Sequence, residues 1–274
     1  MEKKTSINLL GIQIGSEIGK KQENMLKAEK LLEENLNKYE SDVVILPEVW
    51  NCGWNCEDFR SSAEYIHKSE TVEMLKSVAK KYSVNVIGGS FIQRKPDDTY
   101  YNTCPVIDKW GNLICTYEKN HLFSYYGDNE GDYVNCGKNP VMVTLDGVKF
   151  GLTICYDIRF PEIYRAYRIA GADVLINMAA WGYKKKIAWD SMTTSRAVEN
   201  QTYMVALTQT GFLKGGNRNL GHSMILDYKG EILSEITGYE GAIFAKINLS
   251  EMYDFRNKCT ILNDIKDSYE VELK

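Results

Sequence analysis

The chain has 274 residues, 44% of them hydrophobic, and a formal net charge of -4 at pH 7. It is long and apolar enough to bury a large core, and its acidic balance argues against a nucleic-acid-binding protein, which usually presents a basic face. The N-terminus lacks the apolar region of a secretory signal, and no segment approaches the ~20 apolar residues that span a bilayer. We therefore expect a cytoplasmic protein with neither a nucleic-acid nor a membrane partner.

The seven cysteines fit that compartment. An odd number of cysteines spread over a long chain is not a disulfide framework. Cys52 and Cys56 are the most closely spaced pair, but no second cysteine pair or nearby histidine completes a zinc site. We expect neither a metal nor another cofactor.

Strands and helices alternate in the prediction for the first half of the chain. The apolar patterns predict, in order, a strand at Ser6–Ile14, a helix around Met25–Leu36, a strand at Asp42–Leu46, a helix at Val72–Tyr82 and a strand at 84–88. Tyr100–Val106 and Leu113–Tyr117 flank a glycine-containing turn at Lys109–Asn112, which predicts a β-hairpin. A long polar loop follows at Ser124–Asn139.

The second half continues the alternation. It predicts strands at Val141–Thr144, 150–154, Asp173–Asn177, Tyr203–Gln209 and Ala242–Asn248, helices at Ile163–Ala170, Ile187–Asn200 and Leu249–Arg256, and a hairpin over Asp227–Gly230. No Pro/Gly/Ser-rich linker interrupts the chain. We therefore expect an α/β layered fold as a single domain over residues 1–262, followed by a charged tail at 263–274.

The segment 149–162, KFGLTICYDIRFPE, contains the first candidate for catalysis. Its apolar run predicts a buried strand that ends at Cys155, and Pro161 is suited to the first turn of a helix. Cys155 is thus expected at a sharp turn between a strand and a helix, where backbone N–H groups point into a site. A nucleophile fits this position, although a buried structural cysteine fits the segment equally well.

Two further ionisable residues, Glu48 and Lys119, follow predicted apolar strands. Sites in open α/β sheets assemble at the carboxyl ends of strands, but a charged residue there is often simply the first solvated one. Together with Cys155 the set has a chemical logic, because Glu48 can accept the thiol proton and Lys119 can stabilise an oxyanion. His121 lies two residues beyond Lys119, so a Cys–His pair remains a competing arrangement from spacing alone.

The sequence resembles the nitrilase, or carbon–nitrogen hydrolase, superfamily. The resemblance rests on five segments in the family's order: Leu46-Pro-Glu48, Tyr117-Glu-Lys-Asn-His-Leu-Phe123, Gly151 to Glu162, Ser195-Arg-Ala-Val-Glu-Asn200 and Gly221-His-Ser-Met224. It implies a four-layer α-β-β-α sandwich and a catalytic triad at Glu48, Lys119 and Cys155. A second carboxylate best matches Glu130, and the family is rich in homodimers.

The resemblance also implies a mechanism. Cys155 would attack an amide carbon, Lys119 and the backbone N–H of Tyr156 would hold the oxyanion, and Glu48 would transfer protons. Glu130 would orient Lys119 and the substrate nitrogen. His121 would then have a packing role.

The residues after the cysteine, Cys155-Tyr-Asp-Ile-Arg-Phe160, look like the branch that includes ω-amidase and deaminated-glutathione amidase. Substrates of that branch carry a carboxylate, so a cation is expected in the pocket, with Arg159 and Lys184 as candidates for that role or for surface charge. The run Lys184–Lys186 is otherwise read as solvated surface. Trp181 is a candidate pocket wall, and Arg196 is expected to form a structural ion pair, with Glu162 as one partner considered.

These observations predict a cysteine amidohydrolase that acts with water on a small, carboxylate-bearing amide, forms a thioester and releases ammonia. Three alternatives remain open: an N-carbamoyl amide hydrolase of the same superfamily, a non-catalytic ligand-binding protein on the same fold, and a Cys–His thiol enzyme that uses His121.

Overall fold

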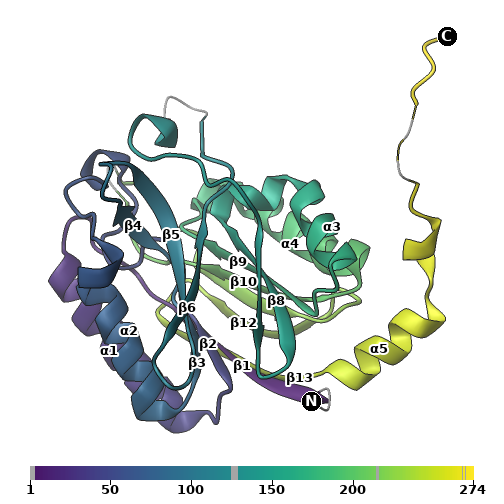
Figure 1. The fold of residues 1–274 in the computed structure, drawn as a ribbon, viewed down its shortest axis with the longest axis horizontal. Helices are drawn as coiled ribbons and strands as arrows, with labels where there is room; N and C mark the ends of the chain where they lie inside the picture. The colour runs from purple at the N-terminus through teal and green to yellow at the C-terminus, as the bar shows by residue number, and fades with distance from the viewer. Residues whose placement is uncertain (1–3, 125–128, 214–215, 267, 269) are drawn as a thin grey trace.

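A computed structural model of the chain describes residues 4–124, 129–213, 216–266, 268 and 270–274. Part of the long loop expected at 124–139, positions 125–128, therefore lies outside the described residues. Two β-sheets pack face to face, and helices cover the outer face of each (Figure 1). The expected four-layer α-β-β-α sandwich is confirmed.

The first sheet contains the N-terminal half of the chain and its last strand. In spatial order it runs β13 (Gly241–Asn248), β1 (Ser6–Gln13), β2 (Val43–Ile45), β3 (Asn85–Ile87), β5 (Tyr100–Ile107) and β4 (Phe91–Arg94), with β6 (Leu113–Glu118) also paired to β5. The hairpin expected from the Lys109–Asn112 turn is the antiparallel β5–β6 pair. Helices α1 (Lys21–Lys38) and α2 (Glu70–Tyr82) cover the outer face.

The second sheet contains the other half. Its spatial order is β12 (Ile232–Thr237), β11 (His222–Leu226), β10 (Tyr203–Thr208), β9 (Val174–Ala179), β8 (Val148–Ile154) and β7 (Val141–Leu145). The outer face is covered by α3 (Pro161–Ile169) and α4 (Lys186–Asn200). As predicted, Pro161 occupies the first turn of its helix.

Strand β1 shows how the sequence divides into layers. Ile7 and Leu9 belong to the core between the sheets, whereas Leu10 and Ile12 belong to the core beneath α1 and α2. This alternation is what a strand with both faces buried requires. At Gly11 the opposite sheet lies so close that a Cβ there would be 2.5 Å from a Leu207 side-chain atom.

The C-terminal helix packs at the edge of the sandwich. After β13 the chain forms α5 (Leu249–Lys258), which projects from the layers in Figure 1 but buries Leu249 and Met252 in the apolar core. Short 3-10 helices complete the described structure: η1 (Cys56–Asp58), η2 (Ile66–Lys68), η3 (Glu130–Asp132), η4 (Cys155–Arg159), η5 (Tyr183–Lys185) and η7 (Ile261–Asp264). Within the described ranges, no helix has both the length and the apolar character that crossing a membrane requires.

Candidate active site

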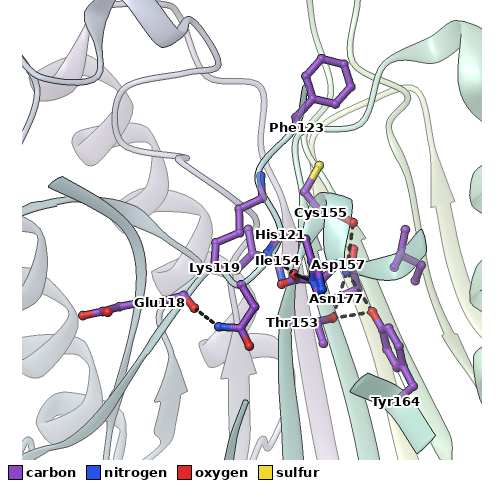
Figure 2. Close-up of polar contacts among 12 residues, drawn as sticks. Glu118, Lys119, His121, Phe123, Thr153, Ile154, Cys155, Asp157, Tyr164 and Asn177 are labelled. Atoms are coloured by element: carbon purple, nitrogen blue, oxygen red, sulfur yellow. Dashed lines mark hydrogen bonds and ion pairs between the residues drawn. The ribbon is translucent and has the colours of Figure 1, made fainter. Parts of the chain in front are cut away.

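The carboxyl ends of three strands bring Glu48, Lys119 and Cys155 to one region between the sheets. Lys119 directly follows β6 of the first sheet, and Glu48 lies three residues beyond β2. Cys155 directly follows β8 of the second sheet. Figure 2 shows Lys119 and Cys155 side by side, with both side chains extending toward Phe123.

Lys119 lies between two carboxylates. Its Nζ is 2.8 Å from Oε1 of Glu48 and 2.8 Å from Oε2 of Glu130, and all three side chains are 0% exposed. The backbone N–H of Phe123 also donates to Glu130. Glu130, whose segment matches the family pattern only loosely, is therefore in direct contact with Lys119. Removing three charges from water is costly, so such a cluster usually serves function rather than stability.

Amide groups fix Glu48 in place. Asn102 Nδ2 donates to Glu48 (2.9 Å) and to Glu130 (3.2 Å), and so bridges the two carboxylates. The backbone N–H of Ala180 donates to the second carboxylate oxygen of Glu48 at 2.8 Å. Gln209 Nε2 donates to the backbone carbonyl of Glu48 at 2.6 Å. Sequence reasoning missed Asn102, because a single polar residue inside an apolar strand resembles many buried asparagines.

The Cys155 backbone adopts an uncommon conformation. Its φ of 46° lies in the left-handed region that residues other than glycine rarely occupy. The residue begins η4, and its carbonyl accepts a hydrogen bond from Asn177 Nδ2 at 3.4 Å. Strain of this kind persists only where the surroundings hold it, and it is concentrated at functional sites. The expected sharp turn at Cys155 is present, with η4 between it and α3.

The charges and burial of the site shift its pKa values. Burial raises the pKa of the Cys155 thiol well above its ordinary value; the Glu48 charge adds to this shift and Lys119 opposes it. Burial also raises the pKa of Glu48 against the opposing effect of Lys119. Burial alone would lower the pKa of Lys119, but the charges of Glu130 and Glu48 outweigh it and raise that pKa. At neutral pH the cysteine is thus a thiol that needs a base, beside a cationic lysine.

A cavity of about 40 Å³ opens above Cys155. Its lining consists of Trp54, Phe123, Cys155, Tyr156, Ala180, Trp181, Gly182 and Lys185. The predicted wall residue Trp181 and the predicted oxyanion residue Tyr156 are both part of it. Three of the remaining lining residues are aromatic or aliphatic, so the cavity offers a small, mainly apolar space next to the thiol.

The cation that lines the cavity differs from the two expected from the sequence. Lys184 is exposed and lies outside the lining, whereas its neighbour Lys185 lines the cavity, with its Nζ 4.6 Å from the centre of the Phe123 ring. The interpretation of the whole run Lys184–Lys186 as solvated surface is therefore wrong for Lys185. Arg159 is not among the described lining residues, but its guanidinium is 5.2 Å from the ring of the lining residue Trp181.

His121 and Arg196 have other partners. The His121 ring stacks on Phe160 with 3.8 Å between centroids, and its Nδ1 is 2.8 Å from Asp157. It lines a separate surface groove rather than the cavity at Cys155. Arg196 forms its ion pair with Glu199 at 2.9 Å, which corrects the suggested pairing with Glu162.

The chain is similar to known carbon-nitrogen hydrolases over most of its length. The model of the carbon-nitrogen hydrolase family matches residues 11–257. The 2-oxoglutaramate amidase of Bacillus subtilis (strain 168) is 38% identical over 259 residues, which cover 94% of this chain and 97% of that protein. The omega-amidase NIT2 of Bos taurus is 31% identical over 261 residues, covering 93% and 94%.

A solved structure of the nitrilase superfamily has a closely similar fold. The crystal structure of Saccharomyces cerevisiae Nit3, described as a member of branch 10 of the nitrilase superfamily, superposes with a TM-score of 0.86 at 27% identity. The match covers 94% of this chain and 95% of Nit3. The family match over most of the chain, the amidase relatives and the shared fold lead to one conclusion: the chain belongs to the carbon-nitrogen hydrolase family, within the nitrilase superfamily, and is an enzyme that hydrolyses carbon–nitrogen bonds.

Proposed function

We propose that the protein is a cysteine amidohydrolase that cleaves a small, carboxylate-bearing amide through a thioester on Cys155 and releases ammonia. The observation that carries this proposal is the buried lysine between two carboxylates, Glu48 and Glu130, beside a cysteine that opens into a cavity. A binding protein has no need of this costly charge cluster, which speaks against the non-catalytic alternative.

In the first half-reaction Cys155 Sγ attacks the amide carbon while its proton passes to Glu48. A base is needed because the pKa of Cys155 is raised, and the raised pKa of Glu48 suits a group that accepts and then returns a proton. Lys119 and the Tyr156 N–H stabilise the oxyanion. Glu48 then protonates the nitrogen, the C–N bond breaks, and ammonia leaves.

In the second half-reaction water hydrolyses the thioester. Glu48 takes a proton from the water and the hydroxide adds to the acyl carbon. The C–S bond of the tetrahedral intermediate then breaks, Glu48 returns its proton to the Cys155 sulfur, and the carboxylic acid leaves. Glu130 keeps Lys119 charged and directed at the oxyanion through its 2.8 Å contact. The overall reaction consumes one amide and one water and yields one acid and one ammonia.

The placement of His121 argues against a Cys–His enzyme. Its Nδ1 is engaged by Asp157 and its ring by Phe160, at a groove other than the one at Cys155. Glu48 occupies the role of base that the rival would assign to the histidine. His121 therefore contributes to packing in this account.

A panel of amides tests the proposed activity. Ammonia release is expected from 2-oxoglutaramate or 2-oxosuccinamate, because relatives at 38% and 31% identity are named 2-oxoglutaramate amidase and omega-amidase. Carbon dioxide released together with ammonia from N-carbamoyl substrates would favour the alternative hydrolase. If no amide or carbamoyl compound in the panel yields ammonia, the proposal fails.

Lys185 is proposed to bind the substrate carboxylate, since it is the cation among the described residues that line the cavity. A hydrogen bond to a charged group contributes about 1.5–3 kcal/mol, so Lys185→Met is expected to raise KM for 2-oxoglutaramate roughly 10- to 100-fold. KM for a neutral amide of similar length should change little. Steady-state kinetics on both substrates measures the effect.

The neighbouring lysine supplies the matched control. Lys184→Met removes the same charge one residue away, on an exposed side chain outside the cavity, and should leave both KM values within about twofold. Equal effects of the two substitutions, or an equal loss on charged and neutral amides, would contradict the assignment of Lys185.

The remaining expectations also belong to this proposal: a single catalytic domain over residues 1–262 with a tail at 263–274, a cytoplasmic location and a homodimer or higher homo-oligomer. Ile169 on helix α3 is 71% exposed. A second copy placed over α3 would cover this isoleucine.

A further inference from the structure

Asp157 is a buried carboxylate that belongs neither to the triad nor to the described lining of the cavity. Asp157 is 0% exposed, and four contacts satisfy its two oxygens. Oδ2 accepts the Ile154 backbone N–H at 2.8 Å and the Tyr117 hydroxyl at 2.6 Å. Oδ1 accepts the His121 backbone N–H at 2.9 Å and lies 2.8 Å from His121 Nδ1. Figure 2 shows Asp157 among Ile154 and His121.

These contacts join the two sheets at the catalytic residues. Ile154 is the last residue of β8 and immediately precedes Cys155, so that bond fixes the nucleophile turn of the second sheet. Tyr117 lies in β6 of the first sheet, two residues before Lys119, and His121 lies two residues after it. The Asp157 side chain therefore forms hydrogen bonds with the turn that carries Cys155 and with residues on both sides of Lys119 in the chain.

The position of a thiol relative to an oxyanion donor must be accurate. A displacement of about 1 Å at a reacting group can lower a rate on the order of 100-fold. Cys155 and Lys119 belong to different sheets, and the Cys155 backbone is strained at a φ of 46°. Apolar packing is non-directional, whereas the hydrogen bonds of a buried, fully satisfied carboxylate fix both the distance and the orientation of the groups that they join.

We propose that Asp157 is a positioning residue that sets the location of Cys155 Sγ relative to Lys119 Nζ across the two sheets. The inference rests on the proposed function, because it takes Cys155 as the nucleophile and Lys119 as the oxyanion donor. Asp157 does not touch the substrate cavity, so its effect is on the rate of the chemical step rather than on substrate binding.

Tyr117→Phe is the test, because it removes one hydroxyl, which donates to Asp157 across the sheets and also accepts the Asn120 N–H at 3.3 Å. kcat for the best amide of the panel is expected to fall about 10- to 100-fold with KM within about twofold. Asp157→Asn replaces one of the two acceptor oxygens with an NH2 donor and leaves too few acceptors for the four contacts; in that background, Tyr117→Phe should lower kcat less than about threefold further, since the two act as one unit. If Asp157→Asn does not fold, the Tyr117→Phe measurement decides alone.

Tyr167→Phe is the matched control. Tyr167 is also a buried tyrosine with two hydrogen bonds, donating to the Leu152 carbonyl at 2.6 Å and accepting from the Val141 N–H at 2.9 Å, but both partners belong to the second sheet. Its loss is expected to lower Tm about as much as Tyr117→Phe while kcat stays within about twofold. Equal kcat values for the two variants would overturn the proposal.

Labelling of Cys155 separates this inference from the proposed substrate. Iodoacetamide alkylation, measured on the Cys155 peptide by mass spectrometry, needs no amide substrate and should be about tenfold slower in Tyr117→Phe than in Tyr167→Phe. If wild type hydrolyses no amide, the proposed function fails, and labelling still decides the inference. Equal labelling rates in the two variants would contradict a positioning role.

Discussion

Cys155→Ala is expected to lower ammonia release from the amide substrate by at least about 10³-fold, to the background rate. In the proposed mechanism both half-reactions pass through a thioester, which alanine cannot form. The fold should survive, since the substitution removes one sulfur next to a cavity and leaves the charge cluster of Glu48, Lys119 and Glu130 intact. Ammonia release measures the loss of activity, and circular dichroism on the same preparation checks that the fold is retained.

Cys52→Ala is the control for that experiment. Cys52 is also a buried free thiol, and burial raises its pKa to about 12, but it lies outside the cavity. Its replacement should leave kcat nearly unchanged. A Cys155→Ala enzyme with wild-type activity, or a Cys52→Ala enzyme as inactive as Cys155→Ala, would refute the assignment of the nucleophile.

Lys119→Met is the second substitution with a large expected effect, and it acts on stability as well as activity. It leaves Glu48 and Glu130 buried without their shared cation, and breaking a buried ion pair in this way costs about 3–5 kcal/mol. Activity should fall to background because the oxyanion loses its charged donor. Urea unfolding of wild type and variant measures the free-energy difference.

The loss of stability in Lys119→Met should depend on pH. The pKa of Glu48 is already raised above its ordinary value of 4.5 by burial, and removing the opposing lysine raises it further. A carboxyl group whose folded pKa is raised stabilises the fold below its unfolded pKa and loses that contribution as pH rises through the folded value. The variant should therefore be closest to wild type near pH 4.5 and fall behind as pH rises toward 7.

An exposed lysine gives the comparison. Lys81 pairs with Glu33 at 2.9 Å on the surface, where both side chains are more than half exposed. Lys81→Met should leave Tm nearly unchanged at every pH because exposed ion pairs are screened by solvent. A Lys119→Met variant that behaves like Lys81→Met would show that the buried cluster is not a charged one.

Much of the fold followed from hydrophobic patterning, since strands with both faces buried leave long apolar runs such as that of β9. Strand β4 was missed, because four residues between a glycine-rich turn and a charged segment are too few for a period to show. The strand forms because it pairs with β5, and the sequence of β4 alone does not show this pairing. Short edge strands of this kind depend on tertiary contacts.

Some residues of the candidate site could likewise be predicted from the sequence, and others could not. Glu48, Lys119 and Cys155 were predictable because each follows an apolar strand, and the ends of such strands converge. Lys185 was not, because only the turn of η5 decides which of three adjacent lysines reaches the cavity. The contacts of Asp157 and Asn102 join segments 40 and 54 residues apart in the chain, and no local pattern records them.

The most direct test of the central claim is the mass of the Cys155 peptide after acid quench during turnover of the methyl ester of the preferred acyl group. An alcohol leaves more readily than ammonia, so hydrolysis of the thioester should limit turnover and the acyl-enzyme should accumulate. The account predicts that the Cys155 peptide carries the mass of the acyl group. Turnover of the ester with an unmodified Cys155 peptide, or with the acyl group on another residue, would contradict it.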